Sequence, residues 1–167
     1  LRGEINRAES IAAAIPRGRP PRMPEDWILF SENTDGDVIG EIRLALHKSQ
    51  PDQALRLLTP ELASAQSKGR VRRQIKLLVL EALAHKFKGT DNASHRSLRK
   101  ALELAAPGRL IRAFLEEGDT VITMLQEEYR TITPDAAGQE AALGASAAFI
   151  ATLLNAAGVC CNKSASG

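Results

Sequence analysis

Aromatic residues and cysteines are scarce in this sequence of 167 residues. Aromatic side chains make up only 4% of the chain, so a β-sheet is disfavoured and leucine and alanine must build the core. Cys160 and Cys161 are adjacent in the sequence, a geometry that strains a mutual disulfide. No histidine or further cysteine lies close to them, so we expect neither a metal site nor any other cofactor.

A strong excess of charge of either sign is also lacking. The formal net charge is only +2, although 25% of the residues are charged, so the dense basic face of nucleic-acid-binding proteins is not expected. The N-terminal stretch LRGEINRAES has no apolar segment typical of a signal peptide, which makes the cytoplasm the expected location. These features predict one soluble globular domain without direct contact to nucleic acid or a membrane.

What the sequence does contain is a strong helical pattern between Gly69 and Gly89. Apolar residues recur there at steps of three and four, and further apolar positions widen this stripe almost to a full turn. Arg72, Arg73 and Lys76 make the segment unsuitable as a membrane span. We therefore predict a buried central helix of an all-α domain. Its apolar residues are Val71, Ile75, Leu77, Leu78, Val79, Leu80, Ala82, Leu83, Ala84 and Phe87.

Turn residues and apolar spacing predict further helices on both sides of the central one. Prolines and basic residues between positions 16 and 24 exclude regular helix, so we expect a loop over residues 16–36. Pro60 is expected to kink one helix, and Thr90 or Asp91 is expected to cap another. The predicted helices span residues 5–15, 38–48, 51–67, 71–88, 91–106 and 139–157, with a short helix at 110–115 and another that opens at 120.

The predicted helices contain an internal repeat. Positions 40 residues apart match in four pairs, which are Leu55 and His95, Leu58 and Leu98, Leu62 and Leu102, and Ala65 and Ala105. A period of helix, turn and helix of this length is typical of an α-solenoid, in which each hairpin buries its open face against the next. We therefore predict stacked antiparallel hairpins that pair 38–48 with 51–67 and 71–88 with 91–106. His95 stands at an otherwise apolar position of this repeat.

The run from residue 54 to residue 117 resembles a known family. Its segments ALRLL, GRVRRQIKLLVLEALAHKFKG and KALELAAPGRLIRAFLEEG are similar to the tetratricopeptide-like (TPR-like) region of LuxR-type, MalT-like ATP-dependent transcriptional activators of bacteria. The resemblance extends over residues 38–157, including SAAFIATLLNAAG, and FLEEG is its most specific piece. It implies a short TPR-like superhelix that senses an inducer or a partner protein and relays this to oligomerisation of the activator.

Two parts of such an activator do not occur in these 167 residues. There is no G-x-x-x-x-G-K-[ST] phosphate loop and no helix-turn-helix, so we expect neither ATP hydrolysis nor direct DNA binding. We predict a single TPR-like domain over residues 1–157, as a fragment of a longer regulator, followed by a flexible tail over residues 158–167. A first hairpin without its neighbour in the array favours weak self-association.

No pattern of catalytic residues emerges from the sequence. Ser94 and His95 are neighbours on a predicted helix and therefore point about 100° apart. The sequence contains no G-x-S-x-G turn, the motif that exposes a nucleophilic serine. Glu116 and Glu117, beside Gly118, are interpreted as an acidic helix end rather than as paired catalytic carboxylates. We therefore expect that the chain is not an enzyme.

One polar strip runs along the otherwise apolar central helix. Gln74, Glu81 and His85 fall within about 60° of one another around the helix axis. Because the first helix of each solenoid hairpin lines the concave surface, this strip is a candidate binding groove, to which Arg43 and His47 of the preceding hairpin would contribute. The same strip also fits a solvated helix edge, and the sequence leaves both interpretations open.

Two functions are compatible with this pattern. The leading hypothesis is a regulatory sensor or protein-interaction module of a LuxR-type activator, whose groove binds a small-molecule inducer or a protein partner and controls oligomerisation. The alternative is a free-standing helical-repeat scaffold or adaptor without a small-molecule effector. The pattern does not define the ligand, because Arg, Glu, Gln and His side chains suit sugars, acids and peptides alike.

Overall fold

The computed structural model describes Ser10, residues 37–132 and residues 140–159. Within these residues all regular secondary structure is helical, which confirms the predicted all-α class. The helices are α3 (Asp37–His47), α4 (Pro51–Ser67), α5 (Val71–Lys88), α6 (Asp91–Ala105), α7 (Arg112–Leu115), α8 (Asp119–Ile132) and α9 (Glu140–Ala156). The predicted N-terminal helix, the loop at 16–36 and the two cysteines lie outside the described residues.

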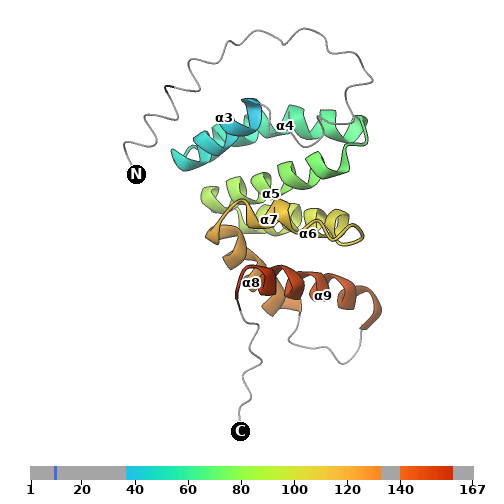
Figure 1. The fold of residues 1–167 in the computed structure, drawn as a ribbon. Coiled ribbons are helices and arrows are strands. Elements are labelled where there is room, and N and C mark those ends of the chain that lie inside the picture. Colours follow the sequence, from blue (N-terminus) through green and yellow to red (C-terminus); the bar gives the residue numbers. More distant parts are fainter. Residues whose placement is uncertain (1–9, 11–36, 133–139, 160–167) are drawn as a thin grey trace.

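Helices that follow one another in the sequence also pack against one another. Figure 1 shows α3 and α4 at one end, α5 and α6 in the middle, and α8 and α9 at the other end. α4 packs against α5, and so joins the first hairpin to the second. The fold is therefore a short stack of helical hairpins, as the 40-residue repeat predicted.

Residues with left-handed backbone conformations separate the helices. Gly69 and Gly89 follow α4 and α5 with φ angles of 63° and 77°, values at which glycine carries no steric penalty. Ser49 adopts the same conformation after α3, with a φ of 57°. Pro60 lies inside α4, which continues as one helix from Pro51 to Ser67.

Thr90 is the N-cap residue of α6, as predicted, but its side chain makes no capping hydrogen bond. Instead, the Thr90 hydroxyl donates a hydrogen bond to the carbonyl oxygen of His85, 3.1 Å away. The hydroxyl thus stabilises the end of α5 rather than the start of α6.

The two hairpins bury equivalent positions. Leu58 and Leu98 are both fully buried, and two more of the predicted pairs are buried in both hairpins, namely Leu62 with Leu102 and Ala65 with Ala105. The predicted pair of Leu55 and His95 is only partly buried, and the adjacent Ala54 and Ser94 are buried instead. Ser94 fits this core because its hydroxyl donates a 2.8 Å hydrogen bond to the carbonyl oxygen of Ala82. Val71 and Phe87 are exceptions to the predicted core, with 43% and 51% of their surfaces exposed. Both lie in terminal turns of α5, which explains the difference.

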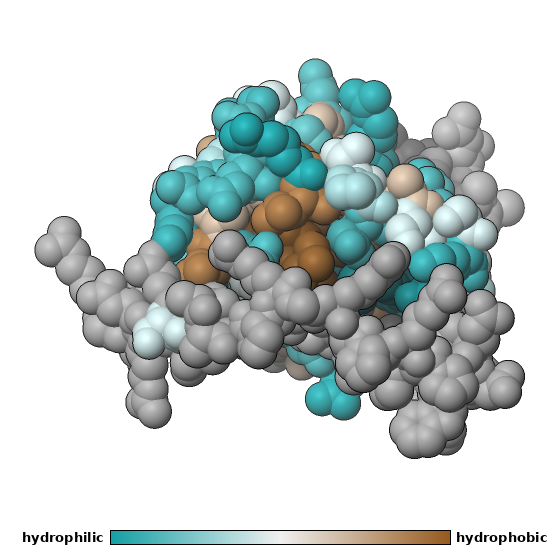
Figure 2. Space-filling view, turned by 90° about the horizontal axis from the view of Figure 1, so that it is seen from above, coloured by the Kyte–Doolittle hydropathy of each residue, from teal (hydrophilic) through white to brown (hydrophobic). Residues whose placement is uncertain are grey.

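The short helix α7 leaves the repeat pattern and ties the middle of the stack to its end. Phe114 is fully buried, and its ring meets that of Phe149 on α9 edge-on, with ring centroids 6.1 Å apart. Figure 2, seen from the end formed by α3 and α4, shows apolar side chains gathered in the middle of that face. No helix among the described residues is long and apolar enough to cross a bilayer.

Candidate functional site

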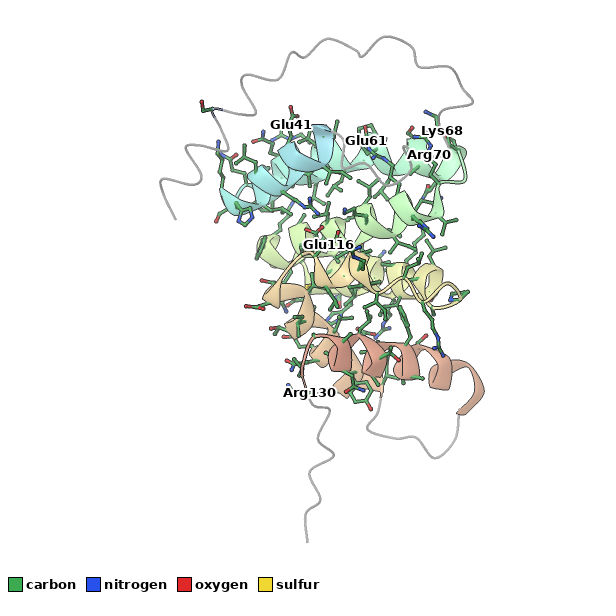
Figure 3. The ribbon with its side chains drawn as sticks, viewed as in Figure 1. Glu41, Glu61, Lys68, Arg70, Glu116 and Arg130 are labelled. Carbon is green, nitrogen blue, oxygen red and sulfur yellow. The ribbon has the colours of Figure 1, made fainter. Side chains whose placement is uncertain are left out.

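The first helices of the hairpins, α3 and α5, meet an acidic turn that follows α7. We call Glu116 and Glu117 the acidic turn. Arg43 of α3 donates two hydrogen bonds to Glu117, one of 2.6 Å from Nη2 and one of 3.2 Å from Nε. Lys76 of α5 donates a 3.3 Å hydrogen bond to Glu116, which is labelled in Figure 3. The two carboxylates thus pair with cations of two different helices.

The Arg43 pair has the geometry of a strong ion pair. Two nitrogens of one guanidinium reach two oxygens of one carboxylate, and only 5% of the Glu117 side chain is exposed. Because α3 and α7 lie far apart in the sequence, the pair closes a long-range contact across the stack. Arg43, one of the predicted groove residues, is therefore engaged by the chain itself.

Three of the other four predicted groove residues contact neighbouring helices or turns. The Gln74 amide donates a 3.1 Å hydrogen bond to the carbonyl oxygen of Ala65 in α4. Glu81 accepts a 2.8 Å hydrogen bond from the Ser97 hydroxyl of α6. Nδ1 of His85 lies 2.9 Å from the Thr90 hydroxyl. His47 is exposed in the last turn of α3.

Gln74, Glu81 and His85 are half-buried, so they are neither core residues nor fully solvated. Gln74 is directed to α4 and Glu81 to α6, so these two side chains connect the central helix to both of its neighbours. Ligand binding by this strip stays a prediction.

A buried carboxylate that sequence reasoning missed lies between α6 and α8. The side chain of Glu128 is fully buried. His95 of α6 approaches one of its oxygens to 2.8 Å, and Arg99 donates a hydrogen bond to the other. One signal pointed to this residue, because Glu128 continues the apolar stripe of Val121 and Leu125 at helical spacing.

Above this carboxylate the surface is hollowed into a cavity of about 760 Å3. We call it the basic pocket. Its lining residues are Asn92, His95, Arg96, Arg99, Lys100 and Glu103 of α6 and Thr131 of α8. Arg96, Arg99 and Lys100 are spaced by three and four residues and therefore share one face of α6. All three are exposed.

A second cavity, of about 490 Å3, occupies the equivalent place in the preceding repeat. We call it the paired pocket, and its lining residues are Asp52, Leu55, Arg56, Thr59 and Lys88. Lys88 Nζ lies 2.6 Å from Oδ1 of Asp52. The hydrogen bond and charge of Lys88 lower the pKa of Asp52 below its ordinary value of 3.8.

Metal binding finds no support among the described side chains. No three histidine, cysteine or acidic residues gather there in a way that could hold an ion.

Comparison with known proteins gives one match. A family model described as the MalT-like TPR region matches residues 2–131, which include α3 to α7 and nearly all of α8. The match ends before α9, although the sequence resemblance was drawn to residue 157. No curated protein and no solved structure matches the chain.

Proposed function

The chain belongs to the MalT-like TPR family, and from this membership we propose that it is the regulatory helical-repeat region of a LuxR-type, MalT-like transcriptional activator. In this role it binds an inducer or a partner protein and thereby controls oligomerisation of the activator. The observation that carries the proposal is the family match over residues 2–131, which coincides with the stacked hairpins. Stacked hairpins present side chains from several rigid helices to one ligand.

The proposed groove consists of Arg43, His47, Gln74, Glu81 and His85. It offers both signs of charge, together with amide and imidazole groups, on helices rather than on loops. Side chains held in this way lose little freedom when a ligand binds. An anionic group of a partner would have to compete with the Glu117 carboxylate for the Arg43 guanidinium.

Within the proposed regulator the chain has no catalytic role. The 167 residues contain no phosphate loop and no helix-turn-helix, so ATP hydrolysis and DNA binding would belong to other parts of the protein. We place the regulator in the cytoplasm. The apolar face at the α3 and α4 end supports weak self-association of the chain (Figure 2).

The first test of this function is the genetic context of the chain. The coding sequence on either side should contain a phosphate loop upstream and a helix-turn-helix downstream. Their absence from the complete reading frame would contradict the proposal and favour the scaffold or adaptor instead.

The second test places the double change Glu81→Ala, His85→Ala in the full-length regulator. We expect a weaker transcriptional response of a reporter under inducing conditions, because two groove side chains are lost. Ser97→Ala is the matched control, since it removes the hydrogen bond to Glu81 and leaves the carboxylate in place. An equal loss of response with Ser97→Ala would assign Glu81 a structural role and move recognition elsewhere.

A further inference from the structure

We propose that the basic pocket between α6 and α8 binds a small organic anion that carries at least two phosphate or carboxylate groups. This site is distinct from the groove of the proposed function, and it does not depend on that function. Its lining comes from the outer helix α6 and the end of α8, whereas the groove residues lie on α3 and α5.

Three cations converge on the cavity from one face of α6. Arg96, Arg99 and Lys100 all line it, and their spacing places them on adjacent turns of one helix. A guanidinium offers paired N–H groups that match the oxygens of a phosphate or a carboxylate, and the lysine adds a point charge. The cavity volume of about 760 Å3 lies in the range of small-molecule sites.

The buried carboxylate of Glu128 gives this cluster a fixed geometry. It lies beneath the pocket, and it holds both His95 and Arg99 by hydrogen bonds. Arg99 uses its Nε for this bond, so the bond does not occupy the two terminal nitrogens of its guanidinium. Two of the lining side chains are thus positioned before any ligand arrives, which reduces the entropic cost of binding.

Charge in the pocket is only partly neutralised. Among the described residues neither Arg96 nor Lys100 forms an ion pair with a carboxylate, although Arg43 of α3, four cationic residues of α5 and Arg99 do so. Glu103 is the only acidic residue in the lining.

The repeat supplies an internal comparison for this inference. Shifted by 40 residues, Asp52, Leu55, Arg56 and Thr59 of the paired pocket correspond in order to Asn92, His95, Arg96 and Arg99 of the basic pocket. The carboxylate of the paired pocket belongs to Asp52, whose Oδ1 forms an ion pair with Nζ of Lys88 at 2.6 Å. The basic pocket has an amide at that position and an additional arginine where the paired pocket has a threonine. The lining of the paired pocket thus carries two cations and one carboxylate, whereas that of the basic pocket carries three cations and one carboxylate.

The test is a titration of the 167-residue chain with pyrophosphate and, separately, with citrate at constant ionic strength. Binding is followed by calorimetry and by NMR shifts of the arginine Nε–H groups. We expect saturable one-site binding of at least one probe, weakened about tenfold by Arg96→Gln or by Lys100→Gln, because each change removes a charge-assisted hydrogen bond. The probe that binds more tightly distinguishes a phosphate ligand from a carboxylate ligand.

Arg56→Gln is the matched control, because it makes the same change in charge at the equivalent position of the paired pocket. We expect it to leave binding unchanged. Equal weakening by Arg56→Gln and Arg96→Gln would show unspecific attraction to surface charge and overturn the proposal, as would the absence of saturable binding to both probes. Thermal melts of each variant verify the fold, and a folded Arg96→Gln variant with unchanged affinity would also overturn the site.

Discussion

The paired pocket and the basic pocket lie at equivalent places of two successive repeats, yet their carboxylates differ in burial and in partners. In the paired pocket, an exposed aspartate meets an exposed lysine, Asp52 and Lys88. In the basic pocket, the carboxylate of Glu128 is fully buried on α8, and it is approached by His95 and Arg99 from α6. Both pockets sit above the same pattern of buried leucines.

The difference between the pockets teaches where charge matters for stability in this fold. An exposed ion pair contributes little to the free energy of unfolding, because water screens the attraction and two flexible side chains must be ordered. A buried carboxylate has lost its hydration, so it depends on the partners that replace water. Ion pairs of two equivalent pockets can therefore be energetically indifferent in one repeat and decisive in the next.

The largest effect is expected from removing the partners of Glu128. The double change His95→Ala, Arg99→Ala should lower the free energy of unfolding by about 3–5 kcal/mol, because it leaves a buried carboxylate without its hydrogen bonds. Urea denaturation at neutral pH measures this loss. Adding Glu128→Leu should restore most of the stability, since no charge then remains buried. A triple variant as unstable as the double one would attribute the loss to packing of α6 instead.

A second prediction concerns the core beneath the two pockets. Leu58→Ala and Leu98→Ala should each cost about 2–5 kcal/mol, because both side chains are fully buried and their truncation leaves a cavity. Chemical denaturation should give similar values for the two variants, since the positions are equivalent in the repeat. A loss below about 0.5 kcal/mol for either leucine would break the equivalence of the two hairpins.

The smallest effect is expected at the ion pair of the paired pocket. Lys88→Ala should leave the midpoint of urea denaturation at pH 7 unchanged within error, because both side chains are largely exposed. A loss as large as that of the Glu128 partners would contradict the contrast between the pockets.

The pH dependence of the same pair follows from the lowered pKa of Asp52. A carboxylate whose pKa is lower in the folded state stabilises the fold above its unfolded pKa and loses this contribution as the pH falls through the folded value. The Asp52 contribution should therefore be present at neutral pH, decline as the pH falls below about 4, and vanish once the pH is below the lowered folded pKa. An NMR titration of the Asp52 carboxyl carbon in the parent chain and in Lys88→Ala checks the cause, and an Asp52 pKa that stays equally low in Lys88→Ala would contradict it.

Much of the fold could be predicted because it depends on local patterns. The helices α4 and α5 have the predicted bounds, α6 differs from prediction by one residue at its end, and α3 and α9 differ by one residue at each end. Apolar spacing, glycine and proline act within a few residues, so they can be interpreted without the rest of the chain. The offset of 40 residues likewise identified positions that are buried together, such as Leu58 and Leu98.

Contacts between distant helices could not be predicted in the same way. Glu116 and Glu117 were interpreted as an acidic helix end, and only the fold brings them to Lys76 and Arg43. Val71 and Phe87 belong to the apolar pattern, but they extend beyond the packed part of α5 and are exposed. Thr90 was expected to cap α6, but its hydroxyl instead binds the preceding helix.

The sequence by itself determined the helical class, the hairpin repeat and the family, because each rests on spacing along the chain. Only the tertiary structure decided the electrostatics of the two pockets. Glu128 is 33 residues from His95 in the sequence, and its burial and its partners depend on how α8 packs against α6. A carboxylate on a helix is ordinary at the surface and critical in the core, and its solvation is a property of the packed helices rather than of the local sequence.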